Sequence, residues 1–456
     1  MFPRCAINYI CPSVWRRRYL PELVLILQRP RRCCSSAPQN LGQVEPLLQL
    51  CVDSYYISPG QTNMELFQHG LSCSYGPLGM GLRRNLLDQW WRSLTTSSDQ
   101  VFGIKTLNCS QNPPLGGAGP LGMVDLDNVA QILGRKELSR EELIQQVQEL
   151  LQRSPFMRTS FFQGALDQFE PSLALVNRRL PFGLAETGLC FQPPGSSGCP
   201  GEATLTSLVW FCSPRTSGQW LDHWTRQRLK WWRNFALSPS NFSSRELPEE
   251  ETEAPVSRGL SIFYRFPWGQ KPIETLSLRG NAELLHVHKG SKVQGRDGRK
   301  TVPHVVTVTG KVDLGMMAFL SDSLQQLSKV GNSKHRLQQR KVLKLHPALA
   351  PVKVALELGR GATAELRQLC EGLMQELKEA GVCVWPGHLK TQAAPLEQMM
   401  AKYDEMGVLF TVVASDSTLE NGLLQVRSRD TTIKETVHVS ETTSYICRHI
   451  SAAHSL

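Results

Sequence analysis

The sequence SYGPLGMGLRRNLLDQWW at residues 74–91 decides how this chain is expected to fold. It predicts a helix with one apolar face, because large apolar residues recur in it at helical spacing. These residues are Leu82, Leu86, Leu87 and Trp90. A glycine-rich turn that leads into a helix with Arg83 and Arg84 suits either a phosphate-binding site or a packed structural helix. The rest of the chain is needed to choose between these two alternatives.

The length and composition indicate a globular protein of two or three domains. The chain has 456 residues, 41% of them hydrophobic, which is too long for a single core. No segment approaches the length of a membrane-spanning helix, so no membrane association is expected. The 13 cysteines are scattered without a C-x-x-C pair, which predicts neither a disulfide framework nor a zinc site. A reducing compartment fits this pattern.

Much of the formal charge of +10 lies at the N-terminus. Residues 1–32 hold seven arginines, no lysine and one acid, so they carry six of the ten excess positive charges. This arginine-rich and acid-poor composition predicts a mitochondrial transit segment over residues 1–40. A secretory signal is the alternative, because the apolar run LVLIL at 23–27 follows three arginines. That run is short and lies between proline and charged residues, which favours mitochondrial import.

The middle of the chain predicts a helical section between two sections rich in strands. The breaker-rich stretch 112–122 comes first, and then SREE at 139–142 forms a capping box with Ser139 and Glu142. A small helical section buries its apolar faces poorly by itself, so a second copy of the chain is a candidate partner. Short strands are expected over 259–265, 273–278 and 282–288. The basic stretch 329–344 is expected to be a charged connector.

Beyond Pro351 the sequence predicts a compact α/β domain. A helix over 362–380 carries leucines on one face and ends at a glycine. The continuous apolar run VLFTVVA at 408–414 is typical of a strand that is covered on both faces.

Several of these stretches resemble the glycyl-type class II aminoacyl-tRNA synthetases. YGPLGMGLRRNLLDQWW is similar to a signature near the start of those enzymes, and PHVVTVTG with GMMAFLSDSL resembles the stretch that holds their third motif. KYDEMGVLFTVV and LLQVRSRDTTIKETV are similar to the end of their anticodon-binding domain. The resemblance implies an α+β fold with a class II synthetase-like antiparallel sheet core and a C-terminal α/β anticodon-binding-like domain. The implied boundaries are 41–110 and 190–345 for the core, 111–189 for a helical insert that serves dimerisation, and 346–456 for the C-terminal domain.

Within this superfamily the chain is similar to the vertebrate accessory, or processivity, subunits of the mitochondrial DNA polymerase. The transit-like N-terminus, the helical insert and RFPWG at 265–269 carry this likeness. It implies a homodimer in the mitochondrial matrix and nucleoid that binds the catalytic subunit of that polymerase and double-stranded DNA without sequence specificity. Raised processivity in mitochondrial DNA replication is the implied function. The alternative is a mitochondrial tRNA-binding or regulatory paralogue of glycyl-tRNA synthetase.

The arginines that a class II synthetase uses to bind ATP are missing. The family's F-R-x-E/D pattern, which holds the α-phosphate, is absent, and the nearest stretch, FYRF at 263–266, lacks the acid. The third-motif stretch TGKVDLGMMAF at 309–319 contains no arginine for the γ-phosphate. We therefore expect no aminoacylation, no catalytic residues and no cofactor. His286 and His288 could share one face of a strand as metal ligands, but no third ligand is near, so no metal is expected.

Three basic stretches are DNA-binding candidates, and the connector 329–344 is the third of them, with an ordinary basic linker as its alternative. The loop 289–300 can follow phosphates because its glycines let the backbone approach, and the stretch 226–233 interleaves cations with two tryptophans. The candidate residues are Lys289, Lys292, Arg296, Arg299, Lys300, Arg226, Arg228 and Lys230. For the stretch 226–233 the alternative is a structural helix whose tryptophans pack inward and whose cations are solvated.

The candidate contact with the polymerase lies in the C-terminal domain. Asn421-Gly422 is expected to turn a hairpin. On the strand that follows, Arg427 and Arg429 are expected to face away from the core, on the opposite side from Leu424. The alternative is an ordinary solvated hairpin face.

Overall fold

In the computed structural model, residues Asn40–Leu456 form one compact unit. The structure describes residues 44–59, 74–95, 100–111, 121–135, 137–192, 201–248, 256–288, 293–294, 300–329, 338–359, 363–389 and 395–454. The predicted transit segment at 1–40 lies outside these residues. Among the helices that are described, none combines the length and apolar character needed to cross a membrane.

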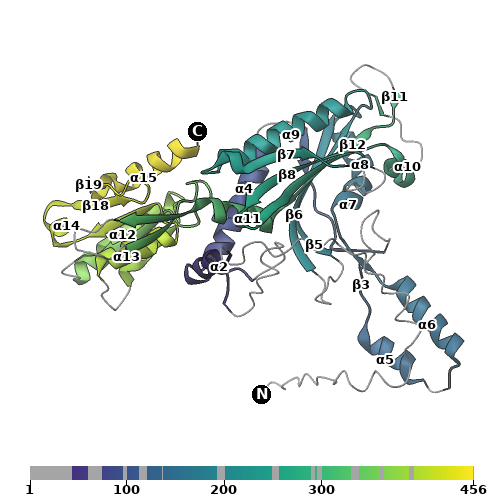
Figure 1. Cartoon of the computed structure of the whole chain (residues 1–456), viewed down its shortest axis with the longest axis horizontal. Helices are drawn as coiled ribbons and strands as arrows, with labels where there is room; N and C mark the ends of the chain where they lie inside the picture. Colours follow the sequence, from purple (N-terminus) through teal and green to yellow (C-terminus); the bar gives the residue numbers. More distant parts are fainter. Residues whose placement is uncertain are drawn as a thin grey trace. The chain divides into compact units, whose positions relative to one another are not determined.

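A seven-stranded sheet forms the centre of the first part of this unit (Figure 1), with the strand order β1-β5-β6-β12-β9-β8-β7. Its strands are β1 (Val101–Gly103), β5 (Phe182–Gln192), β6 (Gly201–Cys212), β7 (Phe242–Glu246), β8 (Val256–Phe266), β9 (Gly269–Arg279) and β12 (His304–Lys311). Every neighbouring pair is antiparallel except β1 with β5. The antiparallel core is therefore confirmed. The core was predicted to resume at residue 190, after the insert. It resumes earlier, because β5 belongs to this sheet and begins at Phe182.

Three long helices build the core on one face of this sheet, namely α4 (Pro77–Thr95), α9 (Ser217–Asn234) and α11 (Val312–Ser323). The shorter helix α2 (Val44–Asp53) adds Leu47 and Leu50 to the same continuous apolar cluster. Leu82, Leu86 and Trp90 of α4 are buried in a cluster that also contains Leu208 and Trp210 of β6. The predicted apolar stripe of the opening stretch is thus confirmed as a core-facing surface.

The opposite face of the sheet carries a second core. Val209 and Phe211 of β6 point there, because successive residues of a strand face opposite sides of a sheet. The helices that contribute to this core are α7 (Phe162–Asp167), α8 (Phe169–Leu175) and α10 (Ala282–Val287). They include two helices of the predicted insert, which are therefore part of the central fold.

The strand predicted over 282–288 is wrong. Residues Ala282–Val287 form α10, and Glu283 in its first turn forms an ion pair of 2.6 Å with Arg279 at the end of β9. His286 is exposed, whereas His288 Nε2 lies 2.6 Å from the backbone oxygen of Leu166. The two histidines therefore do not share a strand face. Across the described ranges no cluster of three metal-ligating side chains is found.

The other two helices of the predicted insert form a helical hairpin, which we call the arm. It consists of α5 (Leu126–Gly134) and α6 (Arg140–Arg153). The predicted capping box of α6 is confirmed, because Ser139 Oγ accepts from the Glu142 N–H and the Glu142 carboxylate accepts from the Ser139 N–H at 2.8 Å. Short strands flank the arm in the sequence, namely β2 (Cys109–Ser110), β3 (Leu121–Gly122) and β4 (Phe156–Met157), which pair as one small sheet.

The C-terminal domain contains a five-stranded sheet with the order β16-β15-β17-β18-β19. The strands are β15 (Val354–Leu358), β16 (Val384–Trp385), β17 (Phe410–Ala414), β18 (Leu423–Ser428) and β19 (Lys434–His438). All residues of the central strand β17 are buried, as its apolar sequence predicts. The helices of this domain are α12 (Ala364–Glu379), α13 (Leu396–Glu405), α14 (Asp416–Asn421) and α15 (Val439–His454). Leu366, Leu373 and Leu377 bury the predicted apolar face of α12.

Two connections differ from the sequence prediction. The expected connector at 329–344 contributes to a hairpin of β13 (Leu324–Lys329) and β14 (Gln338–Leu343). Asn421-Gly422 does not turn a hairpin, because Asn421 ends α14 and Gly422 caps it with a positive φ of 71°. The remaining short elements are β10 (Val293–Gln294), β11 (Lys300–Thr301) and the 3-10 helices η2 (Pro239–Asn241) and η4 (Gly387–Leu389).

Candidate functional site

The glycine-rich start of α4 is a packing element. A Cβ atom on Gly76 or Gly79 would collide with the carbonyl oxygens of Tyr55 and Tyr56, respectively. A Cβ on Gly81 would lie only 2.7 Å from the Pro351 side chain. These glycines are required because α4 approaches other parts of the protein closely. Of the two alternatives for this stretch, the geometry favours the packed structural helix.

The opening stretch and the third-motif stretch meet at Asp313 of α11. The Asp313 carboxylate accepts a hydrogen bond from the Tyr75 hydroxyl and another, of 2.9 Å, from the Thr204 backbone N–H. Burial raises the pKa of Asp313, and the two hydrogen bonds oppose that rise. A buried carboxylate disfavours a phosphate group beside it, so this constellation suits structure better than ATP binding.

Of the two arginines in the opening stretch, one is a surface cation and the other is not. Arg84 is exposed and lies 3.9 Å from Asp88 on the same helix. Arg83 is half-buried and donates from Nη2 to Thr204 Oγ1 at 2.7 Å, so it takes part in the packing of the helix. It reaches the same strand, β6, that holds Asp313 in place.

The prediction that Arg228 binds DNA is also wrong. Arg228 is 2% exposed, and its Nε lies 2.9 Å from a carboxylate oxygen of Glu274 on β9. Glu274 also accepts a 2.6 Å hydrogen bond from Trp232 Nε1, and Arg228 Nη1 donates to Ser93 Oγ at 3.0 Å. The guanidinium group lies 4.2 Å from the centre of the Trp231 ring. These contacts fix α9 to the sheet and leave Arg228 no access to phosphate.

The other two candidate cations of α9 lie on the surface of the protein. Arg226 and Lys230 are exposed on the face of the helix opposite to the buried tryptophans. In the loop candidate, Lys289, Lys292, Arg296 and Arg299 lie outside the described residues. Lys300 is described by its backbone, which pairs with Gln294 in the β10–β11 hairpin.

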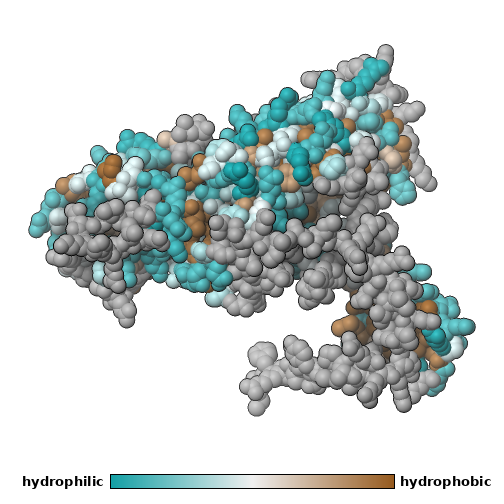
Figure 2. Space-filling view, in the orientation of Figure 1, coloured by the Kyte–Doolittle hydropathy of each residue, from teal (hydrophilic) through white to brown (hydrophobic). Residues whose placement is uncertain are grey.

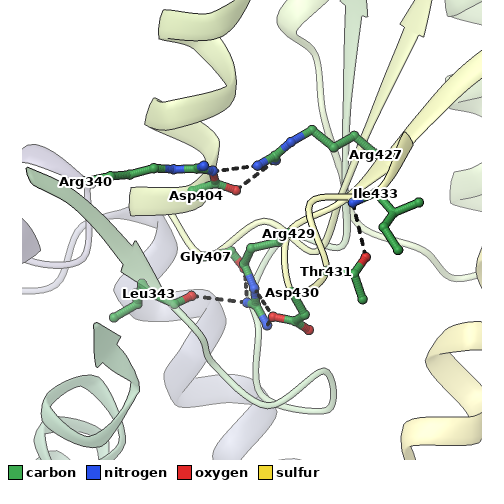
Figure 3. A network of polar contacts seen from close by, with 9 residues as sticks. All are labelled: Arg340, Leu343, Asp404, Gly407, Arg427, Arg429, Asp430, Thr431 and Ile433. Atoms are coloured by element: carbon green, nitrogen blue, oxygen red, sulfur yellow. Dashed lines mark hydrogen bonds and ion pairs between the residues drawn. The ribbon is translucent and has the colours of Figure 1, made fainter. Parts of the chain in front are cut away.

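Arg427 of the predicted polymerase contact lies in a buried ion network (Figure 3). Its two terminal nitrogens donate to the two carboxylate oxygens of Asp404 on α13, each at 3.0 Å. Asp404 also forms an ion pair with Arg340 of β14. Burial lowers the pKa of Arg340, and the nearby Arg427 charge lowers it further. One carboxylate therefore holds two guanidinium groups that repel each other.

Arg429 is buried as well, and it acts as a donor to backbone carbonyls. Nη1 donates to the oxygens of Leu343 and Gly407 at 3.2 and 3.0 Å, and Nη2 donates to Leu345 at 2.8 Å. Asp430 supplies the counter-charge at 2.8 Å from Nε. Burial lowers the pKa of Arg429, and the Asp430 charge opposes this.

The predicted exposed polar face bearing Arg427 and Arg429 is therefore wrong. At Arg427 and Arg429 the chain is covered by α13 and by the segment that leaves β14, so the two arginines support the domain from inside, whereas Gln425 on the same side of β18 is exposed. Asn421 is exposed, with its side-chain oxygen accepting from the Leu423 N–H at 3.0 Å. Sequence reasoning missed Asp404 and Glu274, since the only signal for either was an acid in an otherwise amphipathic segment.

Comparison with known proteins identifies both parts of this architecture. A family model described as "Anticodon binding domain" matches residues 348–449. Proteins named DNA polymerase subunit gamma-2 from Bos taurus and Mus musculus are each 45% identical to this chain and cover 93% and 91% of it, over 89% and 92% of their own lengths. The relative from Xenopus laevis, also 45% identical, covers 90% of this chain over 88% of its own length and carries the word "mitochondrial" in its name.

More distant relatives are named as glycine–tRNA ligases. The protein from Corynebacterium glutamicum is 26% identical and covers 82% of this chain over 92% of its own length. These relationships confirm the synthetase-like fold that the resemblance implied. At 45% identity across about nine tenths of its length, this chain belongs to the DNA polymerase subunit gamma-2 family.

Proposed function

We propose that this chain is the non-catalytic accessory subunit of the mitochondrial replicative DNA polymerase and raises its processivity in the matrix nucleoid. The carrying observation is the likeness to gamma-2 subunits over nearly the whole chain, which spans the core, the arm and the C-terminal domain together. The name of the frog relative supports the mitochondrial location. Although the distant relatives are ligases, the missing ATP-binding arginines and the buried Asp313 support a chain without aminoacylation activity.

The experiment that tests this function uses the full chain in two assays. A tagged chain in mitochondrial extract is expected to retain the catalytic subunit of the DNA polymerase. Added to that purified subunit, it is expected to lengthen the products of a single binding event on a primed template. Recovery of tRNA without polymerase, or glycine-dependent pyrophosphate exchange, would contradict the proposal. The first outcome would favour a tRNA-binding paralogue, the alternative that the anticodon-binding domain supports.

We propose that two chains associate through the arm. The arm helices α5 and α6 contain no buried residue, although both are amphipathic. Apolar side chains remain exposed along them, namely Leu126, Leu133, Ile144 and Leu151. Figure 2 shows apolar surface gathered over these two helices. A helical hairpin of this kind becomes stable when a second hairpin covers its apolar face as a four-helix bundle.

Charged substitutions in the arm are expected to produce monomers. Leu126→Glu with Leu151→Glu should weaken self-association about a hundredfold or more, because each leucine loses about 1.5–3 kcal/mol of burial. Sedimentation velocity across a concentration series measures the change. Leu175→Glu with Leu237→Glu is the matched control, since both leucines are exposed outside the arm. Equal behaviour of the two double variants would contradict the arm as the dimer contact.

We also propose that duplex DNA binds without sequence specificity through the loop 289–300, with Arg226 and Lys230 as further candidates. Reversing the charges of Lys292, Arg296 and Arg299 is expected to weaken duplex binding and to reduce the salt slope by about 0.9 for each phosphate that the loop no longer neutralises. Titration of a labelled duplex at several salt concentrations measures both quantities. Unchanged affinity in this triple variant would remove the loop from the interface.

The proposed docking surface for the polymerase is the C-terminal domain, with Asn421 and Gly422 in the contact area. Asn421 is exposed at the end of α14, and Gly422 turns the chain directly into β18. Arg427 and Arg429 serve this surface indirectly, because they hold β18 against the rest of the protein.

A further inference from the structure

A cavity of about 610 Å³ lies beside the start of α9, where the chain leaves β6. Its volume falls within the range of about 300–1,000 Å³ that is usual for small-molecule sites. The described lining residues fall into two chemical sets, which we call the charged wall and the aromatic wall, although Trp220 and His223 lie between the two arginines along the chain. Arg215 and Arg226 supply charge, and Leu180, Pro181, Trp220 and His223 supply apolar and aromatic surface. The remaining lining residues are uncharged and polar.

The charged wall is suited to an anion. Arg215 and Arg226 are both exposed, and among the residues that the structure describes no acidic side chain lines the cavity. Arg178 and Arg179 are exposed directly before Leu180, and Arg178 forms an ion pair of 3.8 Å with Glu170. Guanidinium groups bind phosphate through paired N–H donors, so a phosphate is the anion that this wall fits best.

The aromatic wall is fixed in place. The Trp220 ring lies 4.8 Å from the buried Trp210 ring and 5.3 Å from the His223 ring, measured between ring centres. Partial burial lowers the pKa of His223, and the Arg226 charge lowers it further. Near pH 7 the imidazole is therefore neutral and adds planar surface and hydrogen-bonding capacity to this wall.

We propose that this cavity binds one nucleotide unit, with a phosphate on Arg215 or Arg226 and the base against Trp220 and His223, which lie between the two arginines along the chain. An inorganic anion would use the arginines but not the apolar wall, whereas a nucleotide uses both. A blunt duplex offers phosphates, but its base faces are stacked. The ligand is therefore either a free deoxynucleoside triphosphate or a nucleotide of an unpaired DNA strand. This site goes beyond the proposed duplex contact at 289–300.

The test compares two double variants of the full chain. Arg215→Ala with Arg226→Ala removes the charged wall. Arg245→Ala with Arg265→Ala removes the same charge from exposed arginines on β7 and β8. The probes are dATP, inorganic tripolyphosphate, a labelled single strand of ten nucleotides and a blunt duplex. Calorimetry and fluorescence anisotropy give the dissociation constants.

The cavity variant is expected to weaken binding of dATP, of the single strand or of both by about tenfold or more, while the control variant changes it by less than about threefold. If the cavity variant binds dATP more weakly, the ligand is a free nucleotide. If it binds only the single strand more weakly, the ligand is a nucleotide of an unpaired strand. The proposal is overturned if tripolyphosphate binds as tightly as dATP and the strand is unaffected. It is also overturned if neither dATP nor the strand binds, or if both double variants behave alike. Polymerase recovery reports on the proposed function independently of this cavity. The triple variant of the loop 289–300, which leaves Arg226 in place, does so for duplex binding.

Discussion

Arg228→Met is expected to lower the free energy of unfolding by about 3–5 kcal/mol, because it leaves the Glu274 carboxylate buried without its counter-charge. Glu274 is 1% exposed, and after this change Trp232 Nε1 would still donate to it but would supply no positive charge. If the chain unfolds as one unit, a loss of this size lowers the midpoint temperature by about 3–5 °C for a protein of this length. Thermal unfolding followed by tryptophan fluorescence measures the shift.

Two further variants show whether this loss comes from the buried charge. Arg226→Met, two residues away on the exposed face of α9, is expected to change stability by less than about 0.5 kcal/mol. Adding Glu274→Gln to Arg228→Met is expected to restore part of the loss, since the amide oxygen still accepts from Trp232 and no charge remains buried. If Arg226→Met and Arg228→Met destabilise equally, the ion pair does not account for the effect.

Asp404→Ala is expected to cost a similar amount, about 3–5 kcal/mol, and to act on the C-terminal domain. The substitution leaves two guanidinium groups, those of Arg340 and Arg427, facing each other without the carboxylate that now separates them. Because β14 and β18 both meet α13 at this carboxylate, we expect faster proteolysis of the C-terminal domain. Limited proteolysis with mass spectrometry locates that change.

The matched control for Asp404 is Glu397→Ala. Glu397 lies on the same helix but is exposed in its first turn, so its loss is expected to cost less than about 1 kcal/mol. If docking depends on a correctly held C-terminal domain, Asp404→Ala also reduces retention of the polymerase, whereas Glu397→Ala does not. Intact stability in Asp404→Ala would show that the two arginines find other partners.

Local patterns in the sequence were sufficient for most of the regular elements. The stripe of α4, the leucine face of α12, the buried run of β17 and the capping box of α6 all follow from residues a few positions apart. The prediction failed where two secondary structures had similar local signals. The short apolar segment at 282–288 is helical, and Asn421-Gly422 ends a helix, because either role suits those residues.

The candidate site was less predictable than the fold. Among the candidate cations that the structure describes with their side chains, Arg226 and Lys230 are exposed as a binding role requires, whereas Arg228, Arg427 and Arg429 are buried. All five look alike in the sequence, because each is an arginine or lysine in an amphipathic segment. The resemblance to the synthetases predicted the architecture. It could not distinguish the exposed cations from the buried ones.

The sequence by itself determined the synthetase-like architecture, the family and the loss of the ATP-binding arginines, since each is a matter of residue type and order. Only the tertiary structure decided which cations are free to bind a ligand. The partner of Arg228 lies 46 residues away, that of Arg427 lies 23 residues away, and Arg429 bonds a carbonyl 86 residues away. A charge enters the interior only where carboxylates or carbonyls from distant segments converge on it, and no local periodicity records that convergence.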